Sequence, residues 1–179
     1  MLWMLAALRC WILTRKGNQK LQVIKLSSNN YALWRDQIEE LFNSSVRINF
    51  PDAELDDSYG RDKCEEVTRF LEDGSAIAFA AIEGEKLVGW VWCHQIHRLD
   101  GFRIHIAEIT VADKWHRQGV GGRLLERVEQ YAAENGYSEI DLFVTASNQS
   151  AVKFYQKADY KPERYLMKKI IRNGENIDA

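Results

Sequence analysis

The chain has 179 residues, 46% of them hydrophobic and 28% charged, which is enough for one globular domain with a substantial core and too few for two. Its net charge of −2 at pH 7 excludes the strong positive field that draws a whole protein to nucleic acid or to an anionic membrane. Three widely spaced cysteines, Cys10, Cys64 and Cys93, favour free thiols over a disulfide framework. We therefore expect a cytoplasmic protein with no nucleic-acid partner.

The first twenty residues, MLWMLAALRCWILTRKGNQK, form a separate segment. Arg9 interrupts their apolar run well short of the roughly 20 residues that a membrane span needs, and the other basic residues follow the apolar part, opposite to a signal peptide. We expect no membrane span. Two interpretations stay open, an amphipathic extension packed on the domain or on a partner subunit, and residues preceding the natural start. The predicted organisation is an extension (1–20), one domain (21–172) and a tail (173–179).

Hydrophobic periodicity and turn residues predict the following elements. In chain order they are a strand over 22–26, a helix over 29–45, an acidic loop over 48–60, a helix over 61–74, and three antiparallel strands between 76 and 112. A helix from 120 to about 135, a strand over 138–146, a helix over 148–158 and a closing strand over 165–170 complete the series. This order predicts a mixed α/β (α+β) fold, with a mainly antiparallel central sheet, helices on both faces and a late βαβ unit.

The stretch HRQGVGG, residues 116–122, lies between a predicted strand and a predicted helix. A glycine-rich loop in this place presents free backbone N–H groups and the positive end of the helix dipole, which suits a phosphate. Arg117 adds a cation, and His116 does so when protonated. The simpler alternative is a tight turn that needs glycine only for its dihedral angles. Arg123 and Leu124 exclude a P-loop and leave a poor match to the dinucleotide fingerprint.

These residues resemble the GNAT superfamily of acetyl-CoA-dependent N-acetyltransferases. The central family motif, Arg or Gln, two variable residues, Gly, a variable residue, then Gly or Ala, aligns with HRQGVG except that His116 stands first. A second motif, Asn, then Ala, then Phe-Tyr, aligns with NQSAVKFYQKADY at 148–160, although Asp159-Tyr160 replaces the usual Gly-Phe ending. The resemblance covers about residues 22–170 and implies the same fold for them.

The resemblance also implies a binding site for acetyl-CoA. In similar proteins the strand before the glycine loop carries a β-bulge, and its backbone contacts the pantetheine arm, here at Ile109 and Val111; the N–H of Val111 would point at the thioester oxygen. The other implied cofactor-binding residues are Arg117, Gln118, Gly119, Val120, Gly121, Gly122, Asn148 and Ala151. Asn148 suits helix N-capping equally well, and the two roles are compatible.

Acetyl transfer requires a neutral amine, yet a free alkylamine with a pKa near 10.4 is protonated at pH 7. Glu108, in IAEITVA on the strand leading into the loop, is the candidate base, acting directly or through a water. The alternative is a carboxylate that faces solvent or pairs with Arg103. The resemblance nominates Tyr155 to protonate the departing thiolate, and the alternative is half-buried packing beside Phe154.

Three other groups of residues carry weaker signals. The cluster of Cys93, His94, His97 and His105 predicts no metal site, because strand alternation separates His94 from Cys93 and His97; hairpin surface or substrate pocket is favoured. The acidic run Asp52, Glu54, Asp56 and Asp57 would attract a cationic acceptor, although a solvated loop is the commoner role. Trp90 and Trp92 share one sheet face, which favours core packing over an acceptor wall.

The sequence thus predicts an enzyme that transfers acetyl from acetyl-CoA directly to a primary amine, of a small cationic molecule such as an aminoglycoside or polyamine. A peptide or protein N-acetyltransferase and a non-catalytic acetyl-CoA sensor stay open as alternatives, as does a homodimer.

Overall fold

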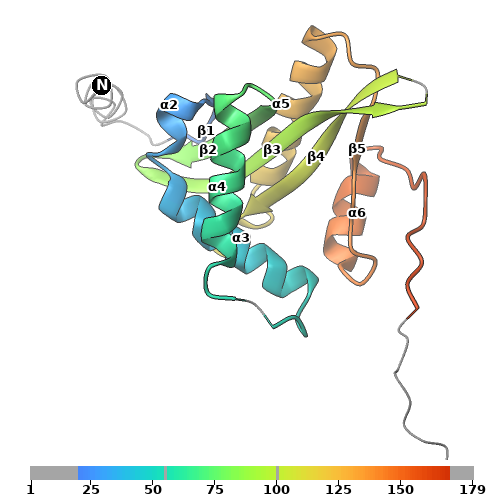
Figure 1. The fold of residues 1–179 in the computed structure, drawn as a ribbon, viewed down its shortest axis with the longest axis horizontal. Coiled ribbons are helices and arrows are strands. Elements are labelled where there is room, and N and C mark those ends of the chain that lie inside the picture. Colours follow the sequence, from blue (N-terminus) through green and yellow to red (C-terminus); the bar gives the residue numbers. More distant parts are fainter. Residues whose placement is uncertain (1–19, 55, 100, 170–179) are drawn as a thin grey trace, which may run out of the picture.

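A computed structural model describes residues 20–54, 56–99 and 101–169. Five strands form one sheet in the order in which they occur along the chain (Figure 1). They are β1 (Gln22–Leu26), β2 (Ala76–Glu83), β3 (Lys86–Arg98), β4 (Gly101–Val111) and β5 (Ile140–Leu142). The first four strands pair antiparallel, and β5 runs parallel to β4 after a helical crossover. The predicted mixed fold with a late βαβ unit is confirmed.

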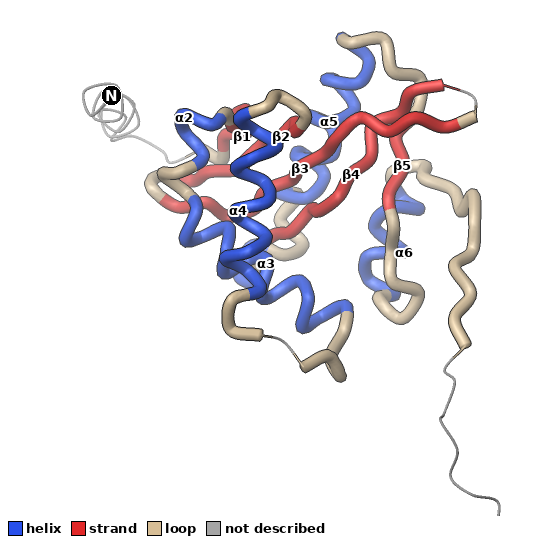
Figure 2. Tube along the Cα trace, in the orientation of Figure 1, coloured by secondary structure: helices blue, strands red, loops and turns tan. Residues whose placement is uncertain are grey.

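Helices cover both faces of this sheet (Figures 1 and 2). They are α2 (Ser28–Tyr31), α3 (Arg35–Asn49), α4 (Tyr59–Glu72), α5 (Val120–Glu134) and α6 (Gln149–Lys157), with a short 3-10 turn over Asp113–Trp115. Helices α3 and α4 pack on one face together with Trp90 and Trp92, while α5 packs on the other against Val91 and Cys93. Both faces of β2 and of β3 from Leu87 to Cys93 are therefore buried, which explains the nearly continuous apolar sequence there, whereas β3 from His94 onward is partly exposed.

The two tryptophans of β3 lie in the core under α3 and α4, as their spacing predicts. The indole of Trp90 is fully buried and meets the ring of Phe42 edge-on at 5.0 Å between centroids. Trp92 is 8% exposed and stacks on Phe70 of α4 at 5.8 Å. Aromatic pairs of this kind add to the free energy gained from burial alone.

The predicted helix over 29–45 is instead two helices. Asn30 folds back, with its Oδ1 accepting from the N–H of Ser27 and its Nδ2 donating to the carbonyl of Lys25. Turn-type hydrogen bonds then form at Leu33 and Trp34, and the second helix begins at Arg35. The bonds of Asn30 belong to the capping box that starts the first helix, whereas the backbone i→i+3 bonds of Leu33 and Trp34 end it, and apolar periodicity reveals neither feature.

Two strand predictions near the C-terminus need correction. Only Ile140–Leu142 of the predicted 138–146 segment is a strand, because pairing with β4 stops where β4 bulges. The closing strand expected over 165–170 is wrong for residues 165–169, which form no strand. Pro162 cannot donate a ladder hydrogen bond, and Tyr165, Leu166 and Met167 all point to solvent. Residue 170, the tail at 173–179 and residues 1–19 lie outside the described residues.

The core under α3 yields a direct test of this packing. Ile38 is fully buried, so Ile38→Ala should lower the free energy of unfolding by about 2–5 kcal/mol, measured by urea denaturation. Ile48 lies on the same helix but is 52% exposed, and Ile48→Ala should change the free energy by about 0.5 kcal/mol or less. Equal losses in the two variants would contradict this assignment of the buried face.

Candidate functional site

Strand β4 separates from β5 halfway along its length. The register opposite β3 shifts between Trp92, which pairs with Glu108, and Cys93, which pairs with Ile106, so Ala107 is the extra residue of a β-bulge. Pairing with β5 ends at Ile106. Because a bulge bends its strand, the rest of β4 leaves β5 and one of its edges stays open. The bulge expected in this strand is confirmed.

The backbone of β4 beyond the bulge points into this gap. The N–H of Ala112 donates to Val88 of β3, so by strand alternation the N–H and C=O groups of Val111 and Ile109 point away from β3. The Val111 carbonyl lies 2.8 Å from Nε2 of His116. Ile109 and Val111 therefore present backbone groups at the open edge, where the sequence placed them.

The glycine loop and the start of α5 lie directly after this open edge. Arg117 (φ +60°) and Gly119 (φ +79°) are both left-handed, and α5 begins at Val120, whose side chain is buried. The first N–H groups of a helix lack intrahelical partners, so this end presents free donors and the positive end of the helix dipole. Nε2 of Gln118 donates a hydrogen bond to the carbonyl of Lys114. A helix start of this kind is a common arrangement for binding a phosphate.

The three glycines serve different purposes. Gly119 supplies the left-handed conformation that starts α5. A Cβ on Gly121 would lie 3.3 Å from the ring of Phe154, so this glycine allows α6 to pack closely against α5. A Cβ on Gly122 would meet nothing within 4 Å. The simpler explanation, glycine for dihedral angles alone, therefore accounts for Gly119 but not for the other two.

Glu108 lies on the face of the sheet that α4 covers. It is half-buried, its Oε1 accepts a hydrogen bond from the hydroxyl of Thr110, and Trp92 is its cross-strand partner. Its charge acts on Tyr59 and Lys63 of α4 and on Tyr155 of α6.

Arg103, the alternative partner for Glu108, makes its ion pairs elsewhere. Its guanidinium contacts Glu139 at 2.5 Å and Glu163 at 2.9 Å.

Tyr155 lies on α6 and is half-buried. Burial raises its pKa well above the usual value of 10, and the negative charge of Glu108 raises it further. Its ring packs edge-on against Phe154 at 5.1 Å and near Tyr160 at 5.8 Å. The expected packing role is therefore present, while the raised pKa keeps the hydroxyl protonated and able to donate a proton.

Asn148 begins α6 and joins this helix to α3. Its Oδ1 accepts from the N–H of Ala151 at 3.1 Å, which is an N-cap, and its Nδ2 donates to Oδ1 of Asn49 at 3.0 Å. The capping role foreseen for Asn148 is confirmed, and Ala151 supplies the capped amide. Both residues help to fix the helix that carries Tyr155.

Two histidines of the hairpin occupy the same sheet face as Glu108 and form a network that the sequence did not reveal. The rings of His94 and His105 lie 5.3 Å apart, and Nδ1 of His105 is 2.5 Å from Asp141 of β5, whose other oxygen binds Arg98 at 3.0 Å. Cys93 faces the opposite core. In the part of the chain that the structure describes, no three His, Cys, Asp or Glu side chains gather as a metal site would require.

The acidic loop after α3 is solvent-exposed at Asp52, Glu54, Asp56 and Asp57. Asp56 accepts hydrogen bonds from Ser58, which lower the pKa of its carboxyl, so it shapes the turn before α4. The charge of Glu108 acts instead on Tyr59 and Lys63 of α4, two residues that the sequence did not single out as candidates. Their spacing of four residues on a helix next to a buried strand was the available signal.

None of the helices in the described residues is both long and apolar enough to cross a membrane.

Among curated proteins, the chain is similar to N-alpha-acetyltransferase 30 of Xenopus laevis, with 28% identity over 111 residues, or 62% of this chain and 40% of that protein. It is also similar to N-alpha-acetyltransferase 50 of Danio rerio, with 32% identity over 92 residues, 51% of this chain and 54% of that one. The chain thus matches only about half or less of the length of these relatives.

Solved structures share the fold. An aminoglycoside acetyltransferase from an uncultured soil metagenomic sample, in complex with sisomicin, superposes with a TM-score of 0.66 at 18% identity, covering 86% of this chain and 97% of that one. A putative acetyl transferase from Pyrococcus furiosus superposes with a TM-score of 0.65 at 26% identity, covering 84% and 100%. The family model for the acetyltransferase (GNAT) family matches residues 35–160, from the start of α3 to the residues after α6. This chain belongs to the acetyltransferase (GNAT) family.

Proposed function

We propose that this protein transfers the acetyl group of acetyl-CoA directly to a primary amine of a small cationic molecule. The observation that carries the proposal is that three features follow one another along the chain from Glu108 to Gly122. They are the half-buried carboxylate of Glu108, the open edge of β4, and the free N–H groups at the start of α5.

The residues around the β4 gap fit the chemistry of acetyl-CoA. The gap between β4 and β5 offers the backbone groups of Ile109 and Val111 to an amide-containing arm, as an added strand would use them. The start of α5, with Gln118 and Gly119 before it and Val120, Gly121 and Gly122 in its first turn, suits the diphosphate. Arg117 is exposed beside it and supplies a charge-assisted hydrogen bond. Acetyl-CoA brings the acetyl group as a thioester.

The side chains around Glu108 supply the proton transfers. The carboxylate of Glu108 removes the proton that an amine carries at neutral pH, directly or through a water. Tyr155 on α6 holds a proton that the departing thiolate can take, because burial keeps its phenol neutral. The N–H of Val111 donates to the thioester oxygen as negative charge grows on it.

Two comparisons bear on the acceptor. The fold neighbours include aminoglycoside acetyltransferases, which supports a small cationic acceptor. The curated relatives are N-alpha-acetyltransferases, which favours a peptide N-terminus as the second candidate.

Isothermal titration with acetyl-CoA, followed by thiol release against both small polyamines and short peptides, decides between the two acceptor classes. Binding without release from any amine would indicate a sensor, and no binding would overturn the cofactor site.

Gly122 tests the cofactor site independently of catalysis. Because a Cβ there meets only open space, Gly122→Ala should leave the free energy of unfolding unchanged or raise it by up to about 1 kcal/mol. The added methyl would occupy the surface that the diphosphate approaches and weaken acetyl-CoA binding by about tenfold in a calorimetric titration. Glu126→Ala, on the exposed side of the same helix and away from its start, is the control and should leave acetyl-CoA affinity unchanged. Wild-type affinity in Gly122→Ala would contradict the assignment.

Glu108→Gln tests the base. We expect kcat/KM at pH 7 to fall by about 10²–10⁴-fold, measured by thiol release. The loss should shrink as pH rises toward the acceptor amine pKa of about 10.4, because the amine then arrives neutral without help. Acetyl-CoA affinity should be unchanged. A loss that is the same at every pH would assign Glu108 to another role.

Tyr155→Phe tests the acid while keeping the ring that packs on Phe154. We expect kcat to fall by about 10²–10³-fold, with little change in the free energy of unfolding. Since burial raises the Tyr155 pKa above 10, the wild type should show no decline from ionisation of this phenol below pH 10. Unaltered kcat in the variant would show that solvent protonates the thiolate.

A further inference from the structure

An aspartate–histidine pair joins β5 to β4 on the sheet face that carries Glu108. Asp141 of β5 is the register partner of His105 of β4, and its Oδ1 lies 2.5 Å from Nδ1 of that histidine. Its Oδ2 accepts a hydrogen bond from Nη2 of Arg98 at 3.0 Å. Only 12% of the His105 side chain and 18% of the Asp141 side chain are exposed. The proton transfers assigned to Glu108 and Tyr155 leave this pair without a role.

The surroundings of Asp141 decide which ring nitrogen of His105 carries a proton. Burial opposes ionisation of Asp141, but hydrogen bonds from His105 and Arg98 lower its pKa, so the carboxylate is ionised at neutral pH and only accepts hydrogen bonds. Nδ1 of His105 is therefore the donor, and in the neutral ring Nε2 keeps a free lone pair. A histidine held in this way is prepared to take up a proton, because the carboxylate stabilises the imidazolium that forms.

The β-bulge at Ala107 places His105 beside Glu108. His105 pairs with His94 of β3 across the sheet. Glu108 pairs with Trp92, two positions earlier on the same face of β3. The two side chains of β4 therefore share a face at the Cα spacing of alternate strand residues, about 6.6 Å. A single water can bridge an imidazole and a carboxylate over such a gap.

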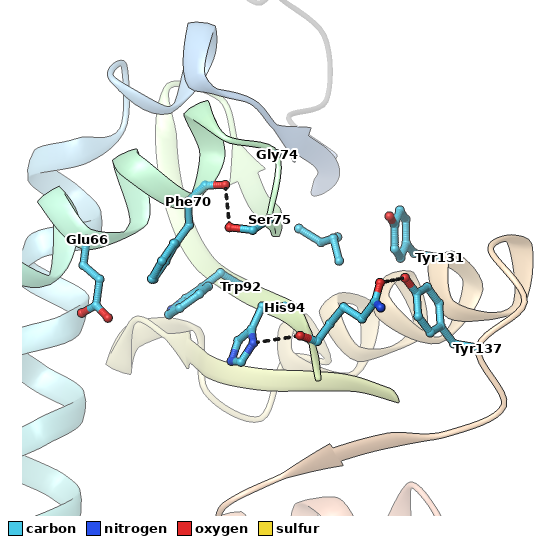
Figure 3. A pocket seen from close by; sticks show the side chains of 10 residues that line it. Glu66, Phe70, Gly74, Ser75, Trp92, His94, Tyr131 and Tyr137 are labelled. Carbon is cyan, nitrogen blue, oxygen red and sulfur yellow. Dashed lines mark hydrogen bonds between the residues drawn. The ribbon is translucent and has the colours of Figure 1, made fainter. Parts of the chain in front are cut away.

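His94 does not offer the same arrangement, although its ring lies 5.3 Å from that of His105. It lies beside Trp92 on the wall of a cavity of about 590 Å³, and its Nδ1 contacts the backbone carbonyl of Gln95 at 3.4 Å (Figure 3). Burial lowers the pKa of His94, and the nearby His105 lowers it further, so this ring is neutral at pH 7. A carbonyl stabilises an imidazolium less than a carboxylate does, because it carries no net charge. His105 is therefore the better proton acceptor of the two.

We propose that His105 relays the proton that Glu108 removes from the acceptor amine. As the ammonium N–H bond breaks, Glu108 gains the proton, and a bridging water carries a proton on to Nε2 of His105. The imidazolium, stabilised by its positioning residue Asp141, then releases the proton to solvent, which leaves Glu108 ionised for the next amine. Acetylation of an ammonium substrate releases one proton per turnover, so this step balances the reaction. The inference rests on the proposed function, since it adds a step to the same reaction.

Charges around His105 set the pH range of the relay. The Asp141 carboxylate favours the imidazolium, whereas the Arg98 cation opposes it. The other titratable groups on or over this sheet face are Arg103 with its partners Glu139 and Glu163, and Tyr59, Lys63, Glu66 and Glu108. Because only the neutral imidazole accepts a proton, the relay should fail as pH falls through the range in which imidazole titrates, about pH 5–8.

The pH profile of thiol release tests the relay. In His105→Gln we expect kcat/KM at pH 7 to fall by about 10–100-fold. The loss should shrink below about pH 5, where the wild-type imidazole is protonated as well. His97→Gln, in the same hairpin but on the opposite face, is the control and should leave kcat/KM unchanged.

Rescue separates proton transfer from a structural role. Imidazole added to the buffer should restore kcat/KM of His105→Ala by about fivefold or more and should not restore Glu108→Gln. NMR of the imidazole nitrogens, which needs no turnover, should show the Nδ1–H tautomer of His105 in the wild type and its loss in Asp141→Asn.

The outcomes separate the two proposals. Thiol release from no amine would overturn the proposed function and the relay with it, whatever the tautomer of His105. If the wild type transfers acetyl, equal profiles of His105→Gln and the wild type, or a loss in His105→Ala that imidazole does not restore, would overturn the relay alone. An Nε2–H tautomer of His105 in the wild type would overturn it as well.

Discussion

The site depends on the separation of β4 from β5 after Ile106. The bulge at Ala107 ends parallel pairing after three residues of β5, and the released edge of β4 then leads without interruption to the start of α5. Without the bulge, β5 would cover the backbone groups of Ile109 and Val111. The same bulge also decides which side chains share a face, because it keeps His105 and Glu108 on one face although they are three positions apart.

The two faces of the sheet hold different parts of the candidate site. On the side of α5 and α6, Val120, Leu124 and Phe154 pack around the first turns of α5, and Gly121 lets the two helices meet. On the side of α3 and α4, Trp90 and Phe42 pack in the core beneath the sheet face that carries Glu108. The candidate base therefore lies on the side of one core, and the start of α5, proposed to bind the diphosphate, belongs to the other.

On the sheet face that carries Glu108, neighbouring basic side chains are paired with carboxylates. Lys63 and Arg98 each contact a carboxylate, Glu66 and Asp141 respectively. Burial opposes ionisation of Asp141, but hydrogen bonds from His105 and Arg98 lower its pKa. Near Glu108, the basic side chains of Lys63 and Arg98 and the carboxylates of Glu66 and Asp141 therefore neutralise one another in pairs.

The sequence by itself determined the family, the glycine loop, the strands β1 to β4 and the residues Glu108 and Tyr155 as candidates, because these depend on local periodicity and motif spacing. Tertiary structure decided which side chains the charge of Glu108 acts on: Tyr59 and Lys63 come from a helix some fifty residues away, and their helical spacing alone does not say which strand they face. It also decided where strands end, since the length of β5 follows from the bulge in β4 and residues 165–169 lack a partner strand despite their apolar sequence. Pairing and burial are properties of the assembled sheet, and strand propensity alone cannot fix them.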